Sequence, residues 1–402
     1  MLNPELWGSL RERYEHPRPR KLLALDGGGI RGVLTLQFLG RIEALLAAAT
    51  GAGSGFRLCD YFDYIGGTST GAIIAAGLAR GMSVAELIEF YRAVGPEMFE
   101  KTHLLRRLHS LYKGDPLIAK LQQTFGVETT LEPGNLRTLL LVVTRNVTTD
   151  SPWPVSSNPA ARYNSPLRPD CNLRVPLWKL VRASTAAPVY FPPEILNWDP
   201  NDPMKTFVFV DGGVTPFNNP AFLLFRMATQ SQYLLEFPTG EKNLLVVSVG
   251  TGAAPTLGLS ADSPDANLLE TMAALPGALM YSIQVEQDVA CRTVGRCTYG
   301  DAIDREILDM VPREGEDVGT VEQRLRRPAV PLGHDLGRAF LYVRYNVDLS
   351  DLGVARLNCG DLRSADVRKM DNATAGNIEA LIRLGKAAAT QVDLTHFGPF
   401  VS

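Results

Sequence analysis

Residues 21–49, KLLALDGGGIRGVLTLQFLGRIEALLAAA, carry the clearest structural signal in the sequence. Lys21–Leu25 is a short apolar run, which is typical of a buried strand. A glycine cluster follows it, and over Val33–Ala49 apolar residues recur at the spacing of an amphipathic helix. A strand, a glycine loop and a helix in this order are typical of the opening of an α/β layer fold.

Similar patterns continue along the chain. Tyr61–Ile65 predicts a second strand, followed by a glycine-rich turn and a small-residue helix over Ala72–Ala79. Ser83 and Glu86 have the spacing of a capping box for the next helix. The other expected segments are strands at Thr138–Thr144, Phe207–Val210, Asn243–Val249 and Phe340–Val347, helices at Leu268–Val289 and Asn372–Thr390, a surface loop at Ser151–Asp170 and an exposed charged stretch at Pro312–Pro331.

No internal repeat and no flexible linker divides the sequence. We therefore expect an N-terminal extension over residues 1–20 and a single domain over residues 21–402 that ends in a helical elaboration.

The composition excludes several classes of protein. The 402 residues include 40 basic and 43 acidic side chains, a net charge of −3, which argues against nucleic acid as a partner. The mixture of 45% hydrophobic and 21% charged residues is that of a globular protein. The longest apolar run, Ala72–Ala79, is far shorter than the roughly 18 residues that span a bilayer. Met1–Arg20 has no signal-peptide pattern, so we expect a cytoplasmic protein.

The five cysteines are an odd number without the spacing of a disulfide framework or of a zinc site. We expect reduced, mostly buried thiols and no metal.

Gly67-Thr68-Ser69-Thr70-Gly71 places a serine between a predicted strand and a predicted helix. A nucleophilic serine needs a sharp turn with small neighbours, since the backbone there is strained and crowded. The start of the helix would also direct free N–H groups toward the reaction centre. Ser69 is therefore a candidate nucleophile.

The glycine cluster Gly27–Gly32 supports two interpretations. Gly27, Gly29 and Gly32 fit the G-x-G-x-x-G pattern of a nucleotide-phosphate loop, but no strand-ending acid follows at about 20 residues. The alternative is an oxyanion hole, in which backbone amides hold the negative oxygen of a tetrahedral intermediate. The serine turn downstream favours the oxyanion hole.

Asp211-Gly212-Gly213 directly follows the predicted strand Phe207–Val210. Its carboxylate could take the proton of Ser69 or orient a histidine that does so. A triad with His334 or His396 would have the usual hydrolase order, but neither histidine lies at a strand end. A Ser–Asp dyad is the simpler interpretation, and the triad stays open.

The motifs DGGGIRG (Asp26–Gly32), GTSTG (Gly67–Gly71) and DGG (Asp211–Gly213), in this order, resemble those of the patatin-like phospholipases. Arg182–Pro188, followed by a Phe-Pro-Pro segment, and Asn218-Asn219-Pro220 are similar to further parts of that family. The resemblance spans roughly residues 21–228 and extends more loosely to the C-terminus. It implies an α/β fold of three α/β/α layers around a central, mostly parallel sheet.

By this resemblance Ser69 is the nucleophile and Asp211 is its base. Gly27, Gly28, Gly29 and the loop that carries Arg31 supply the oxyanion hole. The implied activity is the hydrolysis of acyl esters of membrane glycerophospholipids, with no cofactor. A non-catalytic or nucleotide-binding protein on the same frame remains an alternative, and the oligomeric state stays open.

A lipid hydrolase has to reach its substrate at the membrane surface. Lys101–Lys113, KTHLLRRLHSLYK, mixes basic and apolar side chains as an anionic membrane interface requires, although a core-packing helix could have the same pattern. We expect peripheral contact with the inner face of the membrane.

Bacterial enzymes that resemble this sequence include anti-phage effectors activated by a cyclic nucleotide. The resemblance therefore implies a cyclic di- or trinucleotide activator. Arginine side chains suit phosphate, so surfaces that carry arginines are candidates for binding it. Candidate surfaces are Leu268–Arg296, with Arg292 and Arg296, and the arginines Arg324, Arg326 and Arg327.

Overall fold

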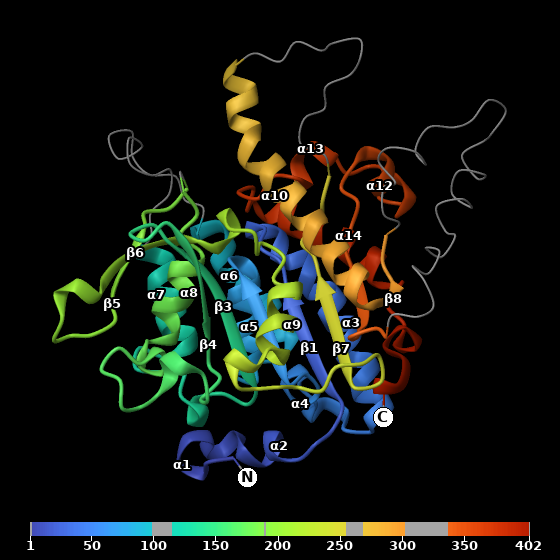
Figure 1. Cartoon of the computed structure of the whole chain (residues 1–402). Coiled ribbons are helices and arrows are strands. Elements are labelled where there is room, and N and C mark those ends of the chain that lie inside the picture. Colours follow the sequence, from blue (N-terminus) through green and yellow to red (C-terminus); the bar gives the residue numbers. More distant parts are fainter. Residues whose placement is uncertain (1, 99–114, 189, 255–267, 302–336, 402) are drawn as a thin grey trace.

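The computed structural model describes residues 2–98, 115–188, 190–254, 268–301 and 337–401 (Figure 1). Within these residues, nine strands form one sheet in the order β5-β6-β3-β2-β1-β7-β9-β8, and β4 also pairs with β3. The strands are β1 (Arg20–Leu25), β2 (Tyr64–Thr68), β3 (Leu139–Asn146), β4 (Ser151–Ser156), β5 (Glu194–Asn197), β6 (Thr206–Asp211), β7 (Leu244–Val249), β8 (Arg296–Tyr299) and β9 (Leu341–Tyr345).

The helices surround this sheet and connect its strands. They are α1 (Pro4–Trp7), α2 (Arg11–Glu15), α3 (Gly32–Thr50), α4 (Leu58–Tyr61), α5 (Thr70–Ala79), α6 (Val84–Met98), α7 (Asp115–Phe125), α8 (Leu177–Ser184), α9 (Ala221–Thr229), α10 (Leu268–Val294), α12 (Asp351–Arg356), α13 (Ser364–Val367) and α14 (Ala375–Ala389).

The sheet is mostly parallel, as expected. Strands β3, β2, β1, β7, β9 and β8 form a continuous parallel series. Only β4, β5 and β6, at one side of the sheet, pair in the antiparallel sense. Central strands such as β7 are buried along their whole length, because helices cover both faces of a parallel sheet.

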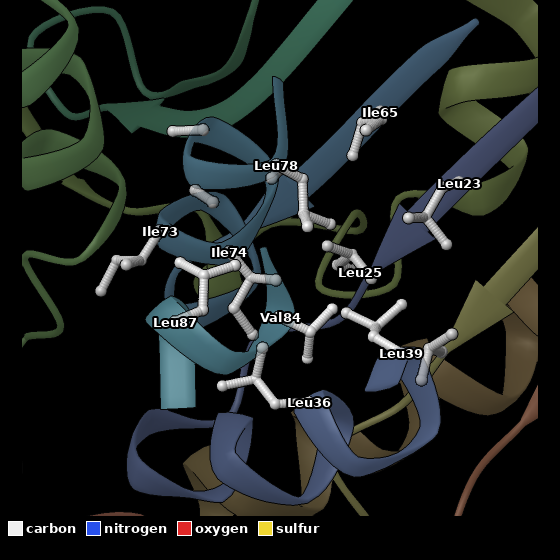
Figure 2. Packing of buried hydrophobic residues seen from close by; sticks show 14 of the residues in the cluster. Leu23, Leu25, Leu36, Leu39, Ile65, Ile73, Ile74, Leu78, Val84 and Leu87 are labelled. Atoms are coloured by element: carbon white, nitrogen blue, oxygen red, sulfur yellow. The ribbon is translucent and has the colours of Figure 1, made fainter. Parts of the chain in front are cut away.

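Alternating side chains of β1 face two separate hydrophobic clusters. Leu23 and Leu25 pack with α3 and α5 on one face (Figure 2), whereas Leu22 and Ala24 pack with α9 and the N-terminal helices on the other. This alternation follows from the period of two in a strand. The two clusters give the three α/β/α layers that the sequence predicts.

Helix α3 and the turn before it form the one segment of the described residues that is long and apolar enough to cross a membrane by length and composition. Its apolar side chains are used in the core, where Leu36 and Leu39 pack against the sheet and its neighbouring helices (Figure 2). The segment is therefore a buried core helix of this fold.

Two expected segments need correction. The second strand covers Tyr64–Thr68 instead of Tyr61–Ile65, because Tyr61 ends helix α4. The expected surface loop Ser151–Asp170 begins with strand β4, which contains Pro152 and Pro154. Both prolines are tolerated because β4 is an edge strand that pairs only with β3. A proline, which has no N–H group to donate, can occupy a position whose N–H would point away from the sheet.

The capping box before α6 is confirmed. The Ser83 amide donates to Glu86 Oε2 at 2.7 Å, and the Glu86 amide donates back to Ser83 Oγ at 3.2 Å. The whole of Lys101–Lys113 and of Pro312–Pro331 lies outside the described residues.

Candidate active site

The register of the sheet brings Ser69 and Asp211 together. Strand β2 pairs with β3 as far as Thr68, which lies opposite Val143. From Thr144 onward, the same edge of β3 pairs with β6 instead of β2, and Asp211 lies opposite Thr144. The two strands run toward each other and end there, so the residue after Thr68 meets the last residue of β6.

Ser69 occupies a strained turn at the start of α5. Its backbone angles are φ 56° and ψ −122°, and a non-glycine residue rarely adopts a positive φ. The turn is also crowded, since a Cβ atom added at Gly67 would overlap the backbone of Gly71. Small flanking residues and a strained serine are the properties expected of a nucleophile turn.

The Ser69 hydroxyl donates a hydrogen bond of 2.6 Å to Asp211 Oδ2. The other carboxylate oxygen, Asp211 Oδ1, accepts the Gly213 N–H at 2.6 Å. The Asp211 side chain is almost fully buried, with 4% of the residue exposed. Burial raises the pKa of Asp211 to about 6, although the hydrogen bonds from Ser69 and Gly213 oppose this shift. The carboxylate therefore lies against the serine with a proton affinity close to that of a general base at neutral pH.

Ser184, at the end of α8, holds the serine turn in place. Its hydroxyl accepts the Ser69 N–H at 2.9 Å and donates to the Val143 carbonyl at 2.6 Å. The motif Arg182–Pro188 contains Ser184 but carries no local signal for this role.

The glycine loop after β1 contacts the site from a third direction. Among the described residues, the N–H groups of Gly28 and Gly29 make no hydrogen bond. The N–H of Gly27, in contrast, donates to the Asn218 carbonyl at 3.0 Å. The Gly27 amide is therefore occupied in this structure, whereas those of Gly28 and Gly29 have no such partner, and the oxyanion hole stays a prediction.

Arg31 lies at the end of this loop. Its guanidinium Nε donates to the Gly28 carbonyl at 3.4 Å, so the side chain folds back onto the loop. Burial and the nearby Arg368 lower the pKa of Arg31 to about 10. Arg31 therefore contacts the glycine loop as a half-buried cation.

Asp26, directly before the glycines, is anchored from two distant parts of the chain. Arg344 of β9 donates to both of its carboxylate oxygens, at 2.9 and 2.6 Å. Gln284 of α10 donates to the same carboxylate. One helical turn earlier, Met280 Cε lies 3.6 Å from where a Cβ atom would stand on Gly213. Helix α10 thus contacts the loops on both sides of the site.

Of the two candidate triad histidines, the structure describes only His396, and its contacts are with two tyrosines. His396 stacks on Tyr299 and shares a 2.9 Å hydrogen bond with the Tyr345 hydroxyl. His334 and the arginines Arg324, Arg326 and Arg327 lie outside the described residues.

Comparison with known proteins identifies the class of protein. The family model for patatin-like phospholipase matches residues 23–225, which is just over half of the chain. The chain therefore belongs to the patatin-like phospholipase family and has its fold.

The chain is similar to particular members of this family. It is 32% identical over 260 residues to a cGAMP-activated phospholipase of Vibrio cholerae serotype O1, and the match covers 59% of this chain and 66% of that protein. A cGAMP-activated phospholipase of Escherichia coli is 30% identical over 249 residues, with 59% and 63% covered. Patatin-2-Kuras 4 of Solanum tuberosum is 30% identical over 245 residues, with 58% and 62% covered. The chain thus spans a little under two thirds of the length of each of these relatives.

Proposed function

We propose that the protein hydrolyses acyl esters of membrane glycerophospholipids, with Ser69 as the nucleophile and Asp211 as its base. The observation that carries the proposal is the 2.6 Å hydrogen bond between these two side chains at a strained turn. Membership of the patatin-like phospholipase family supports the substrate class.

In the proposed acylation step, Ser69 Oγ attacks the ester carbonyl and its proton moves to Asp211. The carbonyl oxygen becomes an oxyanion, which the free N–H groups of Gly28 and Gly29 would hold. Collapse of the tetrahedral intermediate breaks the ester C–O bond, and Asp211 returns the proton to the leaving alcohol. The acyl group stays on Ser69 until water removes it by the same steps in reverse.

A nucleotide-phosphate site in the glycine loop receives less support. A bound phosphate would use the free amides at the start of α3. However, the Ile30 N–H already donates to the Met370 carbonyl at 2.9 Å, and the Gly27 N–H is also occupied. The C-terminal part of the chain thus packs where such a ligand would lie.

Control by a cyclic di- or trinucleotide is part of the proposal, because two relatives are named cGAMP-activated phospholipases. Helix α10 is suited to transmit a signal, since it contacts Asp26 through Gln284 and approaches Gly213 through Met280. The basic residues at its C-terminal end and at the start of β8 are less suited to bind the nucleotide. Arg292 is paired with Asp288 and Arg296 with Glu241, so phosphate would have to compete with a carboxylate at each.

We further propose that the protein acts in the cytoplasm, at the inner face of the membrane. The proposal rests on the basic and apolar sequence of residues 101–113, which include Arg106 and Arg107.

The function is tested by lipid-product mass spectrometry on mixed phospholipid vesicles, with any required activator supplied by a panel of cyclic nucleotides. The wild type should release free fatty acid and lysophospholipid. Ser69→Ala should release neither, whereas Ser231→Ala, which removes an exposed serine outside the site, should match the wild type. Equal product from Ser69→Ala and the wild type would refute the nucleophile.

A further inference from the structure

The side chain of Asn218 has no role in the chemistry described so far, although it lies inside the site. Asn218 is 2% exposed and stands in the turn between β6 and α9. Its backbone carbonyl accepts the Gly27 N–H. Within the part of the chain that the structure describes, its side-chain oxygen Oδ1 is buried without a hydrogen-bond partner.

An unpaired buried acceptor costs about 1–3 kcal/mol, so buried polar groups nearly always have a partner. A residue that bears this cost next to reacting groups is more simply explained by a ligand than by packing. The ligand has to be a hydrogen-bond donor, because the unpaired atom is an amide oxygen.

Asn218 Oδ1 lies next to both glycine loops of the site. A Cβ atom added at Gly27 would overlap Asn218 Oδ1 and would lie 3.2 Å from Ser69 Cβ. A Cβ atom added at Gly213 would lie 3.1 Å from Asn218 Oδ1 and 3.0 Å from Asp211 Oδ1. The amide oxygen therefore lies between Gly27, which also approaches Ser69, and Gly213, which also approaches Asp211.

We propose that Asn218 Oδ1 positions the water molecule that hydrolyses the acyl-enzyme. This inference rests on the proposed function, because it requires an acyl group on Ser69. One hydrogen of the water is donated to Asn218 and the other to Asp211, which leaves an oxygen lone pair directed at the acyl carbon. An amide suits this task because it accepts a hydrogen bond at every pH and adds no second charge beside Asp211.

The step balances in atoms and electrons. The water oxygen forms a bond to the acyl carbon and its proton passes to Asp211, which gives a tetrahedral intermediate. The C–Oγ bond to Ser69 then breaks, and the proton on Asp211 passes to Ser69 Oγ. The fatty acid leaves and the enzyme returns to its starting state.

The test separates deacylation from acylation with a 4-nitrophenyl ester in rapid-mixing experiments. Asn218→Ala should release a burst of one nitrophenolate per enzyme and then turn over on the order of 100-fold more slowly than the wild type. Because only the second step is slowed, kcat and KM should fall together and kcat/KM should change little. Intact-protein mass spectrometry should find the acyl group on the variant, and hydroxylamine should restore its turnover.

A matched control is the neighbouring Asn219→Ala. The Asn219 side chain is also buried, but its oxygen has partners: it accepts the Ala221 N–H at 3.0 Å and the Ser248 hydroxyl at 3.3 Å. This variant should accumulate no acyl-enzyme. Asn218→Ser, which keeps a shorter acceptor, provides a second test in case Asn218→Ala fails to fold, and it should also accumulate the acyl-enzyme.

A parallel fall of kcat and kcat/KM in the Asn218 variants, without an acyl adduct, would overturn the inference and assign Asn218 to shaping the glycine loop. Unchanged kinetics would also overturn it. The proposed function stands in both cases as long as the wild type turns the ester over and Ser69→Ala does not. Equal turnover by Ser69→Ala would refute the proposed function itself.

Discussion

Asp211 carries the proton chemistry of the proposed mechanism, and its environment predicts how the activity depends on pH. Burial is the main cause that raises the pKa of Asp211, to about 6, well above the usual value for aspartate. The base works only when it is ionised. It is therefore active above its own pKa and inactive below it.

We expect kcat/KM to be constant at neutral pH and to fall about tenfold per pH unit below pH 6. The measurement is a pH–rate profile between pH 4.5 and 8 with a soluble ester substrate. His396→Ala should keep both the rate and the profile, since His396 packs against Tyr299 and Tyr345. Loss of the acid limb in that variant would instead support a histidine base.

At this scale, residue types indicated the reacting groups but could not reveal their supporting contacts. The glycines and Ser69 were predicted because strand, loop and helix follow each other locally in the sequence. The roles of Asn218 and Ser184 were missed because each depends on a contact with a residue more than 100 positions away. The occupied amide of Gly27 was missed for the same reason.

Among the helices, α10 contacts the loops on both sides of the site. Figure 1 shows α10 extending beyond the ends of the strands, at the top of the view. Its residues Met280 and Gln284 are one turn apart and approach the loops that carry Gly213 and Asp26. Residues three or four apart lie on one helix face, so a single face of α10 approaches both loops.

We expect Gln284→Leu to lower kcat by about tenfold or more while the protein stays folded. The substitution removes one hydrogen bond to Asp26 but leaves its ion pair with Arg344, so the glycine loop shifts slightly without unfolding. Gln287→Leu is the control, because no contact between Gln287 and Asp26 is found among the described residues. This variant should keep a kcat close to that of the wild type. Steady-state kinetics and circular dichroism give the comparison, and equal rates for the two variants would contradict a role for α10.

The sheet shows how far element-level prediction could reach. The parallel core was predictable, because buried strands read as continuous apolar runs. Strand β4 was not, because Pro152 and Pro154 are typical of a loop and are tolerated here only because β4 is an edge strand. The antiparallel pairing of β6 with β3 sets the position of Asp211. This pairing depends on the register between distant segments, so no local sequence pattern indicates it.

For the whole molecule, the central question is how activity is controlled. Two relatives are named for activation by cGAMP, and the match to this chain covers a little under two thirds of their lengths. The buried network of Asp26, Arg344 and Gln284 joins segments more than 250 residues apart. A ligand that moves α10 would therefore change the glycine loop.

We expect lipid hydrolysis to rise at least tenfold when the matching cyclic di- or trinucleotide is added, because differential binding to an active state shifts the population toward it. The measurement is the release of fatty acid from vesicles with a panel of cyclic nucleotides, with the linear dinucleotides as controls. Full activity without any nucleotide, together with no response to the panel, would contradict this control.

The most direct test of the central claim is to label the protein with a fluorophosphonate probe and map the modified peptide. The wild type should carry one adduct, on Ser69, and Ser69→Ala should carry none. Asp211→Asn should label far more slowly, because the serine loses its base. An adduct on another serine, or undiminished labelling of Ser69→Ala, would contradict the account.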